Sequence, residues 1–474
     1  MRKYQEITPE ILEKLQQAAP GHVYTGSDIN EDYSHDEMEL YGKRMPDVLI
    51  IAQSVEEISA VMKICNEYHV PVTTRGAGTA ETGSPVPIYG GVLISTEKFN
   101  HIKEFHPDDM SVTIEPGVLL FDLAAACAEK GFLYPPDPGE KFATVGGNAS
   151  TNAGGMRAVL YGTTKDYVNA IQVVLADGTI TRFGADVCKS STGYNLKDLI
   201  VGSEGTLAII TELTLKMTPA PGIVASLIVP FEDMHAAIRT VFKIKNSRIK
   251  PQALEFMERS MVEMSEKHLQ KEVFPKSVGG VEAQAYLLVT IEADDEDALY
   301  DKIEKASELV LEAGAIDVLV ADSPSKMKEA WAARSGFVEA IKALSTMIDE
   351  CDVVVPVSKI ADYLEEAEAI GEECGLTMRC YGHAGDGNLH IKLCTDSLPE
   401  EEFRRRCEVC FDKLYDKAVV YGGLLSGEHG VGSVKRKYLE RFVGKTNMQL
   451  MTRIKQAFDP NMILNPGKVV YDDV

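Results

Sequence analysis

The sequence lacks features that mark several classes of protein. It has 48 basic residues against 72 acidic ones, a formal net charge of −24. Without a basic excess, binding to nucleic acid or to an anionic membrane surface is disfavoured. No apolar run approaches the roughly 18 residues that a membrane-spanning helix needs, and the N-terminus has no apolar signal-peptide core. We therefore expect a cytoplasmic protein with no transmembrane segment.

Cysteine patterns and nucleotide fingerprints are also sparse. The nine cysteines are odd in number and scattered, which is not a disulfide framework. Cys407 and Cys410 form a CxxC, but it lies in a charged, helix-like stretch and no second CxxC occurs. We therefore interpret both cysteines as helix residues rather than as a redox or metal pair. No iron–sulfur motif is visible. No GxGxxG opens a βαβ unit, so no NAD site is expected.

What is present indicates a multidomain globular chain. The 474 residues are 45% hydrophobic and 25% charged, which is ordinary for soluble domains. Residues 1–45 read as a helical lead, because Thr8-Pro9 is a helix-start signal. From residue 46 to 219, strands alternate with helices, and a DG turn at 177–178 predicts a hairpin. Pro219-Ala-Pro221 is a boundary signal.

The second half of the chain has a different pattern. Between residues 220 and 420, two β-α-β segments predict a ferredoxin-like α+β domain. Two helical stretches follow, at 324–348 and 359–374. Asp386-Gly387 predicts a turn between strands at 377–382 and 389–393. Residues 421–474 form a closing segment.

Three glycine-rich loops are the main functional signal of the first half. The loop Arg75-Gly-Ala-Gly-Thr79 follows a strand, and Thr144–Gly155 holds four glycines, two asparagines and three hydroxyl residues. Gly202-Ser-Glu-Gly-Thr206 is the third. Glycine permits close approach of backbone N–H groups to an anion. Each loop alone is compatible with a simple turn, but the set indicates an extended nucleotide-like ligand.

Together with Pro135-Pro-Asp-Pro138, Tyr161-Gly162 and Val201–Thr206, these loops resemble a known family. The chain is similar to the vanillyl-alcohol oxidase/p-cresol methylhydroxylase flavoproteins, in the glycolate oxidase/D-lactate dehydrogenase branch of FAD-dependent D-2-hydroxy acid dehydrogenases. The resemblance implies an α+β fold: a two-subdomain FAD domain at 46–219, a ferredoxin-like substrate (cap) domain at 220–420, and a C-terminal segment, 421–474, that returns to the FAD domain.

The resemblance also implies which residues bind FAD. They are Arg75, Gly76, Ala77, Gly78, Thr79, Pro138, Thr144, Gly146, Gly147, Asn148, Ser150, Thr151, Gly154, Gly155, Tyr161, Glu204, Gly205, Ala208, Ile209, Ile210 and Asn465. Some members of the superfamily link the flavin covalently to a histidine of the first loop. Residues 70–100 of this chain contain no histidine, so the resemblance implies a non-covalent flavin. Relatives often read Gly-Leu-Ser-Gly-Gly where this chain reads Ala80-Glu-Thr-Gly-Ser84, which adds a carboxylate near the cofactor.

Histidines gather in two short tracts of the second half. Gly382–His390 holds His383 and His390, and Ser426–Gly432 holds Glu428 and His429. A bend at Asp386-Gly387 would bring the first two imidazoles together, and Glu428 would complete a three-ligand metal site with open positions. From the residues alone, a hydrogen-bonded turn and metal-free flavin or substrate contacts remain open.

The family resemblance favours the metal. It implies that His383, His390 and Glu428 bind Zn²⁺, or else Fe²⁺ or Mn²⁺, and that His429 is the catalytic base. It also implies that Arg334 is catalytic and binds the substrate carboxylate, with Asn388 and His429 beside the substrate. Tyr381, Lys392 and Glu350 are weaker candidates for the pocket lining.

The sequence therefore predicts an enzyme, a flavoprotein oxidising a short D-2-hydroxy acid, with D-lactate as the first choice and glycolate or D-2-hydroxyglutarate as alternatives. Electrons would pass to an electron-transfer flavoprotein or an iron–sulfur subunit. Three rivals stay open: an oxidase that uses O₂ directly, a transferase of the alkylglycerone-phosphate synthase type, and a non-catalytic FAD-binding subunit.

Overall fold

The structure is a computed structural model that describes residues 4–471, the side chain of Glu39 excepted. The chain forms two compact units. Unit 1 comprises Met1–Ala153, Thr163–Ala220 and Glu428–Val474, and unit 2 comprises Gly154–Gly162 and Pro221–Gly427. The sequence placed divisions after residues 219 and 420, whereas the units divide after 220 and 427.

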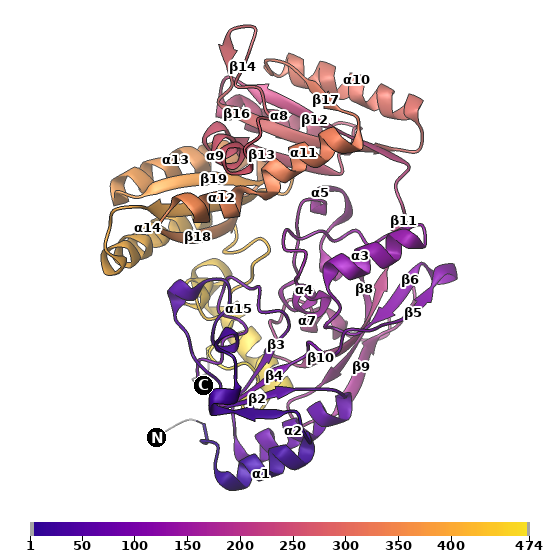
Figure 1. Cartoon of the computed structure of the whole chain (residues 1–474), viewed down its shortest axis with the longest axis vertical. Coiled ribbons are helices and arrows are strands. Elements are labelled where there is room, and N and C mark those ends of the chain that lie inside the picture. Colours follow the sequence, from indigo (N-terminus) through magenta and orange to yellow (C-terminus); the bar gives the residue numbers. More distant parts are fainter. Residues whose placement is uncertain (1–3, 472–474) are drawn as a thin grey trace. The chain divides into compact units, whose positions relative to one another are not determined.

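Unit 1 contains two larger sheets (Figure 1). The first has the order β1 (Val23–Thr25), β2 (Val48–Ile51), β4 (Val92–Ser95), β3 (Val72–Arg75), with β2, β4 and β3 parallel. The second is antiparallel, in the order β5 (Ile102–His106), β6 (Ser111–Ile114), β10 (Ile209–Lys216), β8 (Val168–Val174), β9 (Ile180–Gly184). The β8–β9 pair confirms the predicted hairpin.

A shared core joins the two sheets of unit 1. Helix α2 (Val55–Tyr68) begins at Ser54, whose hydroxyl accepts the N–H of Glu57, and it buries Ile58, Val61, Met62 and Cys65. These side chains lie in one cluster with Ile50 of β2 and with Val174 and Ile209 of the second sheet. Helix α1 (Pro9–Ala18) packs on α2. The lead predicted as helical also supplies β1, which pairs with β2.

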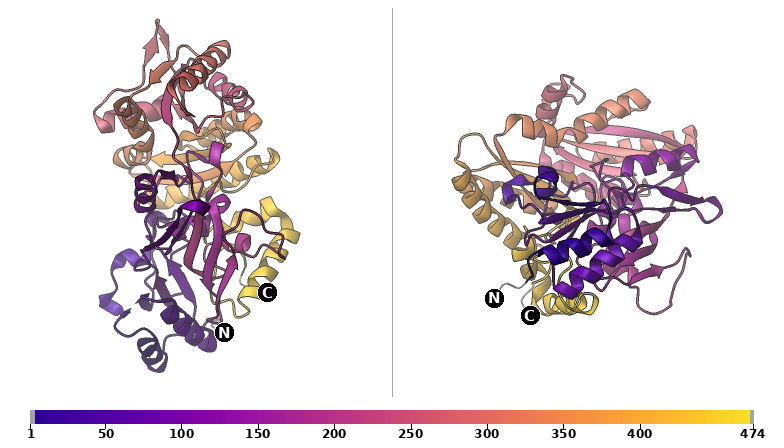
Figure 2. Two further views of the ribbon diagram at one scale, coloured as in Figure 1. Left: turned by 90° about the vertical axis from the view of Figure 1, so that its right-hand side faces the viewer. Right: turned by 60° about the horizontal axis from the view of Figure 1, so that its bottom comes forward.

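The C-terminal segment returns to unit 1, as the fold prediction required. Helix α15 (Arg436–Phe458), yellow in Figure 2, precedes Ile463 and Leu464, which are fully buried in the core around α2. Leu464 forms a parallel bridge with Val72 of β3. The ammonium of Lys455 donates to the carbonyls of Thr206 and Leu464, at 2.6 and 2.7 Å.

Unit 2 is built on one antiparallel sheet. Its order is β17 (Leu319–Ala321), β12 (Ile223–Phe231), β16 (Ala285–Ala293), β13 (Ala253–Glu258), β19 (Thr377–His383), β20 (Asn388–Thr395), β18 (Met347–Val354). The first four strands follow the chain order 4-1-3-2 with helices α8 (Met234–Lys245) and α10 (Glu296–Glu312) between them. This topology confirms the predicted ferredoxin-like domain.

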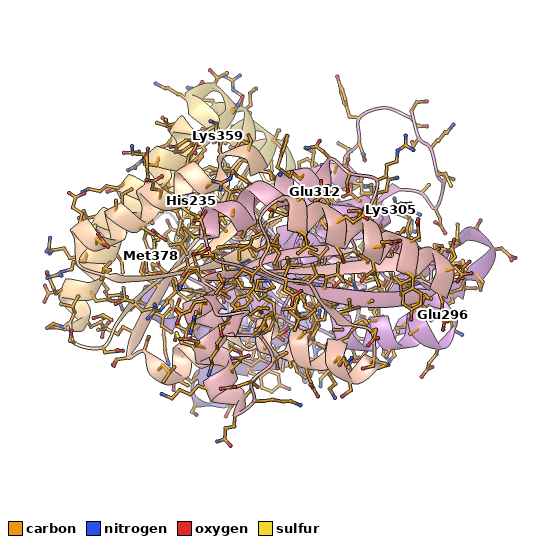
Figure 3. The ribbon with its side chains drawn as sticks, turned by 90° about the horizontal axis from the view of Figure 1, so that it is seen from above. His235, Glu296, Lys305, Glu312, Lys359 and Met378 are labelled. Atoms are coloured by element: carbon orange, nitrogen blue, oxygen red, sulfur yellow. The ribbon has the colours of Figure 1, made fainter. Side chains whose placement is uncertain are left out.

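Helices cover both faces of this sheet. Figure 3 labels His235 on α8 and Glu312 on α10, and it shows these helices on one side, where α13 (Ile360–Cys374) packs on α8. The other face carries α9 (Arg259–Leu269), α11 (Pro324–Ser335) and α12 (Phe337–Leu344), whose apolar residues cluster with Met257 and Tyr381. The candidate site residues of this sheet, Glu255, His383 and His390, lie on this second face.

Two local predictions were wrong. The helix expected over 324–348 ends at Leu344, and Met347–Val354 is the edge strand β18. The second glycine-rich segment, expected as a loop, contains a helix instead: Val145–Thr151 forms α4 with four buried residues. Thr144 caps α4 by accepting the N–H of Gly147 at 3.2 Å. Among residues 4–471, no helix is long and apolar enough to cross a membrane.

Candidate functional site

The three glycine-rich loops converge within unit 1. A Cβ at Gly76 would lie 2.2 Å from Oγ1 of Thr144, so the first loop passes directly against the start of α4. The third loop meets the end of α4: the N–H groups of Gly202 and Glu204 donate to the carbonyls of Ala149 and Ser150, at 2.9 and 2.8 Å. The first and third loops therefore both contact α4, which brings the three glycine-rich segments together.

Asn465 joins these loops to the C-terminal segment. Its side-chain amide donates to the carbonyls of Glu204 and Ser84, at 2.6 and 3.0 Å. Its amide oxygen accepts from the ammonium of Lys468 at 2.6 Å. Asn465 has a left-handed backbone, with φ 42°, which asparagine tolerates better than most residues. Its side chain thus holds the loops together from within the protein.

Most polar side chains predicted to bind FAD are engaged by the protein itself. The guanidinium of Arg75 donates to the carbonyls of His35 and Asp32, at 2.6 and 2.8 Å, and lies over the ring of Tyr33. The hydroxyls of Ser150 and Thr151 donate to carbonyls one turn earlier in α4. A cofactor at this site would therefore be held largely by main-chain groups.

Glu204 has a structural role in the same region. Its carboxylate accepts the N–H groups of Val431 and Gly432, each at 2.8 Å, and the hydroxyl of Ser84. Burial raises the pKa of Glu204, while these donors act against that shift. Glu204 thereby fixes the backbone just beyond His429.

One buried donor of α4 fits a bound ligand. The amide nitrogen of Asn148 is buried and, among the described residues, has no hydrogen-bond acceptor. An unsatisfied buried donor costs about 1–3 kcal/mol. A heterocycle or phosphate bound along the loops would supply the acceptor. The residues present thus fit FAD.

The remaining predicted FAD contacts are divided between the two units. Gly154, Gly155 and Tyr161 belong to unit 2, where the Tyr161 hydroxyl donates to the carboxylate of Glu292 at 2.8 Å. Gly205 faces the hydroxyl of Thr74. Ile209 is fully buried in the core of unit 1. Pro138, Ala208 and Ile210 are buried too, and Gly78 lies against Arg75.

The histidine hairpin of unit 2 forms as predicted. Strands β19 and β20 pair antiparallel, with His383 opposite Asn388 and Tyr381 opposite His390. Gly387 in the connecting turn has φ 82°, a conformation that glycine adopts without strain. Because side chains alternate along a strand, Asn388, His390 and Lys392 share one face of β20. The rings of His383 and His390 meet edge to face, with centroids 5.3 Å apart.

A buried carboxylate orients His383. Glu255 of β13 has no exposed surface, and its Oε1 lies 2.8 Å from Nδ1 of His383. The other oxygen, Oε2, lies 2.9 Å from Nε and 2.6 Å from Nη2 of Arg334 on α11. Burial opposes ionisation of Glu255, but His383 and Arg334 together hold its pKa below the usual value. An ionised Glu255 can only accept, so Nδ1 of His383 carries the hydrogen and Nε2 keeps its lone pair.

A second carboxylate orients His390 in the same way. Oε1 of Glu350 on β18 lies 3.1 Å from Nδ1 of His390, and Oε2 is paired with the buried ammonium of Lys392. Tyr381 stacks on His390 with ring centroids 5.1 Å apart, and the guanidinium of Arg334 lies 4.7 Å from the centre of the same tyrosine ring. Each imidazole is therefore fixed in both tautomer and rotation.

Asp352 anchors the segment that leads to Glu428. This fully buried carboxylate accepts from the amide of Asn388 and the hydroxyl of Ser426, each at 2.6 Å, and from the N–H of Gly427 at 3.0 Å. Asn388, predicted to bind substrate, thus has its amide group directed at Asp352. Glu428 is the next residue along the chain and is counted with unit 1.

His429 has a carboxylate partner in unit 1. Its Nδ1 lies 3.2 Å from Oε2 of Glu81, the residue at which the first loop departs from the family pattern. The structure thus brings together His383 with His390 and Arg334 in unit 2, and His429 with Glu81 in unit 1. The sequence did not single out Glu255 or Asp352, although a lone acidic residue within an apolar strand is a usable signal.

Cys407 and Cys410 lie on the buried face of α14 (Glu400–Val420). Burial raises the pKa of both thiols, which disfavours the thiolate form that redox and metal chemistry use. This agrees with reading them as helix core.

Comparison with known proteins identifies the family. Residues 46–184 match a model described as "FAD binding domain", and residues 221–469 match "FAD linked oxidases, C-terminal domain". The chain is 53% identical to a D-lactate dehydrogenase of Anaerostipes hadrus, covering 99% of each chain. It is 36% identical to the glycolate oxidase subunit GlcD of Bacillus subtilis, covering 98% of each.

Solved structures share the fold. A p-cresol methylhydroxylase with substrate bound aligns with a TM-score of 0.81 at 19% identity, covering 98% of each chain. An alkyldihydroxyacetonephosphate synthase aligns with a TM-score of 0.74 at 16% identity, covering 98% of this chain and 86% of that one. At such identities the likeness establishes the fold and not the reaction. The predicted α+β, p-cresol methylhydroxylase-type architecture is confirmed.

Proposed function

Since the chain belongs to the family of FAD-linked oxidases, we propose that it is an FAD-dependent dehydrogenase of short D-2-hydroxy acids, with D-lactate as its first substrate. The observation that carries this proposal is in unit 2. Two buried imidazoles, each oriented by a carboxylate, share a sheet face with a buried arginine. The names of the relatives, D-lactate dehydrogenase and glycolate oxidase subunit, support the same substrate class.

We propose that His383, His390 and Glu428 bind a divalent metal ion. Histidines that bind metals typically donate their other ring N–H to a carboxylate, which is the arrangement of His383 with Glu255 and His390 with Glu350. Three ligands from two imidazoles and a carboxylate leave positions open for substrate. This donor set suits Zn²⁺, and also Fe²⁺ or Mn²⁺. When bound, the metal supplies Lewis acidity at the substrate hydroxyl and FAD supplies the hydride acceptor.

The protein's own groups bind the acid and move its proton. Arg334 holds the substrate carboxylate through the Nη1 end of its guanidinium, since Glu255 takes the Nε–Nη2 edge. His429 accepts the hydroxyl proton at Nε2, while Glu81 holds Nδ1. Burial of Arg334 and Glu255 keeps water from the carboxylate site.

The reduced flavin must pass its electrons on. We propose that the acceptor is a partner protein, an electron-transfer flavoprotein or an iron–sulfur subunit, in the cytoplasm. Reoxidation of the reduced enzyme by air at catalytic rates would instead indicate an oxidase.

Anaerobic bleaching of the flavin tests the proposal. Holoenzyme is mixed with D and L forms of lactate and 2-hydroxyglutarate, and with glycolate, before and after treatment with a chelator. We expect rapid loss of FAD absorbance with a D-acid, abolished by chelation and restored by Zn²⁺ or Mn²⁺. Bleaching that persists after proven metal removal would refute the metal role alone. No bleaching with any acid would refute the dehydrogenase and favour the transferase.

A further inference from the structure

Glu255 stands between two groups that the proposed function uses separately. It lies within the apolar strand β13, where Phe256 pairs with Gly382 and so places residue 255 beside His383. Both carboxylate oxygens lie near Nδ1 of His383, at 2.8 and 3.0 Å, and Oε2 also lies 2.6 Å from Nη2 of Arg334. These three residues come from β13, β19 and α11, so only the folded sheet brings them together.

A fully buried carboxylate is costly unless its charge is compensated. Elsewhere in unit 2, buried Glu266 is bonded by backbone: Oε1 accepts the N–H groups of Val273 and Phe274, at 2.6 and 2.7 Å. Those bonds close a local loop after α9. Glu255, in contrast, is bonded to side chains from two distant segments, and both belong to the candidate site.

We propose that Glu255 is a positioning residue shared by the two halves of the site, fixing His383 for the metal and Arg334 for the substrate carboxylate. The inference rests on the proposed function and deepens it. On the imidazole, the Nδ1 bond selects the tautomer whose Nε2 is available to a cation. On the guanidinium, the hydrogen bond from Nε and the ion pair with Nη2 fix the plane in which Arg334 meets the substrate carboxylate.

Glu350 is a matched comparison, because it is paired with the other candidate metal-binding imidazole, His390, rather than with His383 and Arg334. It contacts His390 and Lys392 but has no bond to Arg334 among the described residues. Loss of Glu350 should therefore weaken metal binding alone. Loss of Glu255 should weaken metal binding and carboxylate binding together.

The test compares wild-type holoenzyme with Glu255→Gln, Glu350→Gln and Glu266→Gln. Metal per FAD is measured by elemental analysis across a chelator series, and KM and kcat for D-lactate are measured at saturating Zn²⁺ or Mn²⁺. We expect both Glu255→Gln and Glu350→Gln to lower metal affinity about 10- to 100-fold. Only Glu255→Gln should also raise KM at saturating metal, about 10- to 100-fold, the effect of a charged hydrogen bond.

Glu266→Gln controls for removal of a buried carboxylate from unit 2 and should change neither quantity. Should Glu255→Gln fail to fold, Glu255→Asp keeps the charge opposite Arg334. Its shorter side chain cannot reach both partners, so metal retention or KM should still change.

The shared role would be overturned if Glu255→Gln kept either the wild-type metal affinity or the wild-type KM. It would also be overturned if Glu255→Asp kept both. Wild-type enzyme that holds no metal and is not reduced by any hydroxy acid would instead overturn the proposed function.

Discussion

Single carboxylates set the chemistry at the residue scale. The three candidate histidines each have an acidic partner on Nδ1: Glu255 for His383, Glu350 for His390 and Glu81 for His429. Where the carboxylate accepts a hydrogen bond from Nδ1, Nε2 keeps its lone pair. The first two pairs are buried and rigid. The third is partly exposed and lies in a loop that departs from the family pattern, so its contribution is the easiest to isolate.

Replacing Glu81 tests that contribution. Glu81→Ala removes the carboxylate that lies 3.2 Å from Nδ1 of His429, so the imidazole loses a contact that orients it toward the hydroxyl proton. We expect the rate of anaerobic flavin reduction by D-lactate to fall about 10- to 100-fold, with metal content unchanged. Glu81→Gln retains an acceptor for Nδ1–H and should lose less. Rapid-mixing absorbance of FAD measures both.

Unit 1 offers a matched control, the carboxylate–histidine pair of Glu115 and His101, with Nδ1 2.8 Å from Oε2. Glu115→Ala breaks the same kind of bond outside the candidate site and should leave flavin reduction unchanged. Equal rates in Glu81→Ala and wild type would remove Glu81 from the mechanism.

At the element scale, close packing explains why α4 is rich in glycine. The N–H of Gly146 donates to the carbonyl of Pro116 at 2.8 Å, and a Cβ at Gly146 would lie 2.4 Å from the Cβ of Pro116. The helix can approach residues 116–118 only because this position has no side chain. The glycines thus serve packing as well as approach to a nucleotide.

Gly146→Ala should therefore destabilise the protein, although alanine is the better helix former by about 1 kcal/mol. Overpacking of this kind costs about 1–3 kcal/mol. We expect a lower melting temperature and less FAD per protein, measured by the 450 to 280 nm absorbance ratio. Gly139→Ala is the control, since a Cβ there meets nothing within 4 Å. Full FAD retention and unchanged stability in Gly146→Ala would contradict the packing argument.

The element that sequence reasoning missed is instructive. Strand β18 reads Met-Ile-Asp-Glu-Cys-Asp-Val-Val, with acidic residues at three of eight positions. Acidic residues are uncommon in strands. In β18 all three carboxylates are buried, where an uncompensated charge is costly. Glu350 is paired with His390 and Lys392 of β20. Asp352 accepts hydrogen bonds from Asn388 of β20 and from Ser426 and Gly427. These contacts, rather than strand propensity, account for the acidic residues of the strand.

At the scale of the whole molecule, the sequence predicted the features that local sequence signals encode. The hairpin at Asp386-Gly387 and the ferredoxin-like order follow from turn residues and periodicity, and the FAD domain follows from the resemblance of the glycine-rich motifs to a known family. Glu255 did not follow, because its partners Arg334 and His383 lie 79 and 128 residues away. Which predicted FAD side chains are engaged by the protein likewise depended on tertiary contacts, such as those of Arg75 with the N-terminal lead.

The stability of the chain should depend on pH through Glu258, at the end of β13. Burial, reinforced by the nearby charge of Glu368, raises the pKa of Glu258 to about 7. The folded state therefore binds its proton more tightly than the unfolded chain, for which the ordinary value is 4.5. This contribution to stability is complete below pH 4.5 and is lost as the pH rises through 7.

Glu258→Gln should then stabilise the protein by up to about 3 kcal/mol at pH 8 and have little effect at pH 5. Thermal unfolding at the two pH values measures the difference, and Glu368→Gln should reproduce part of it. An equal shift of the melting temperature at both pH values would show that Glu258 is not protonated in the folded protein.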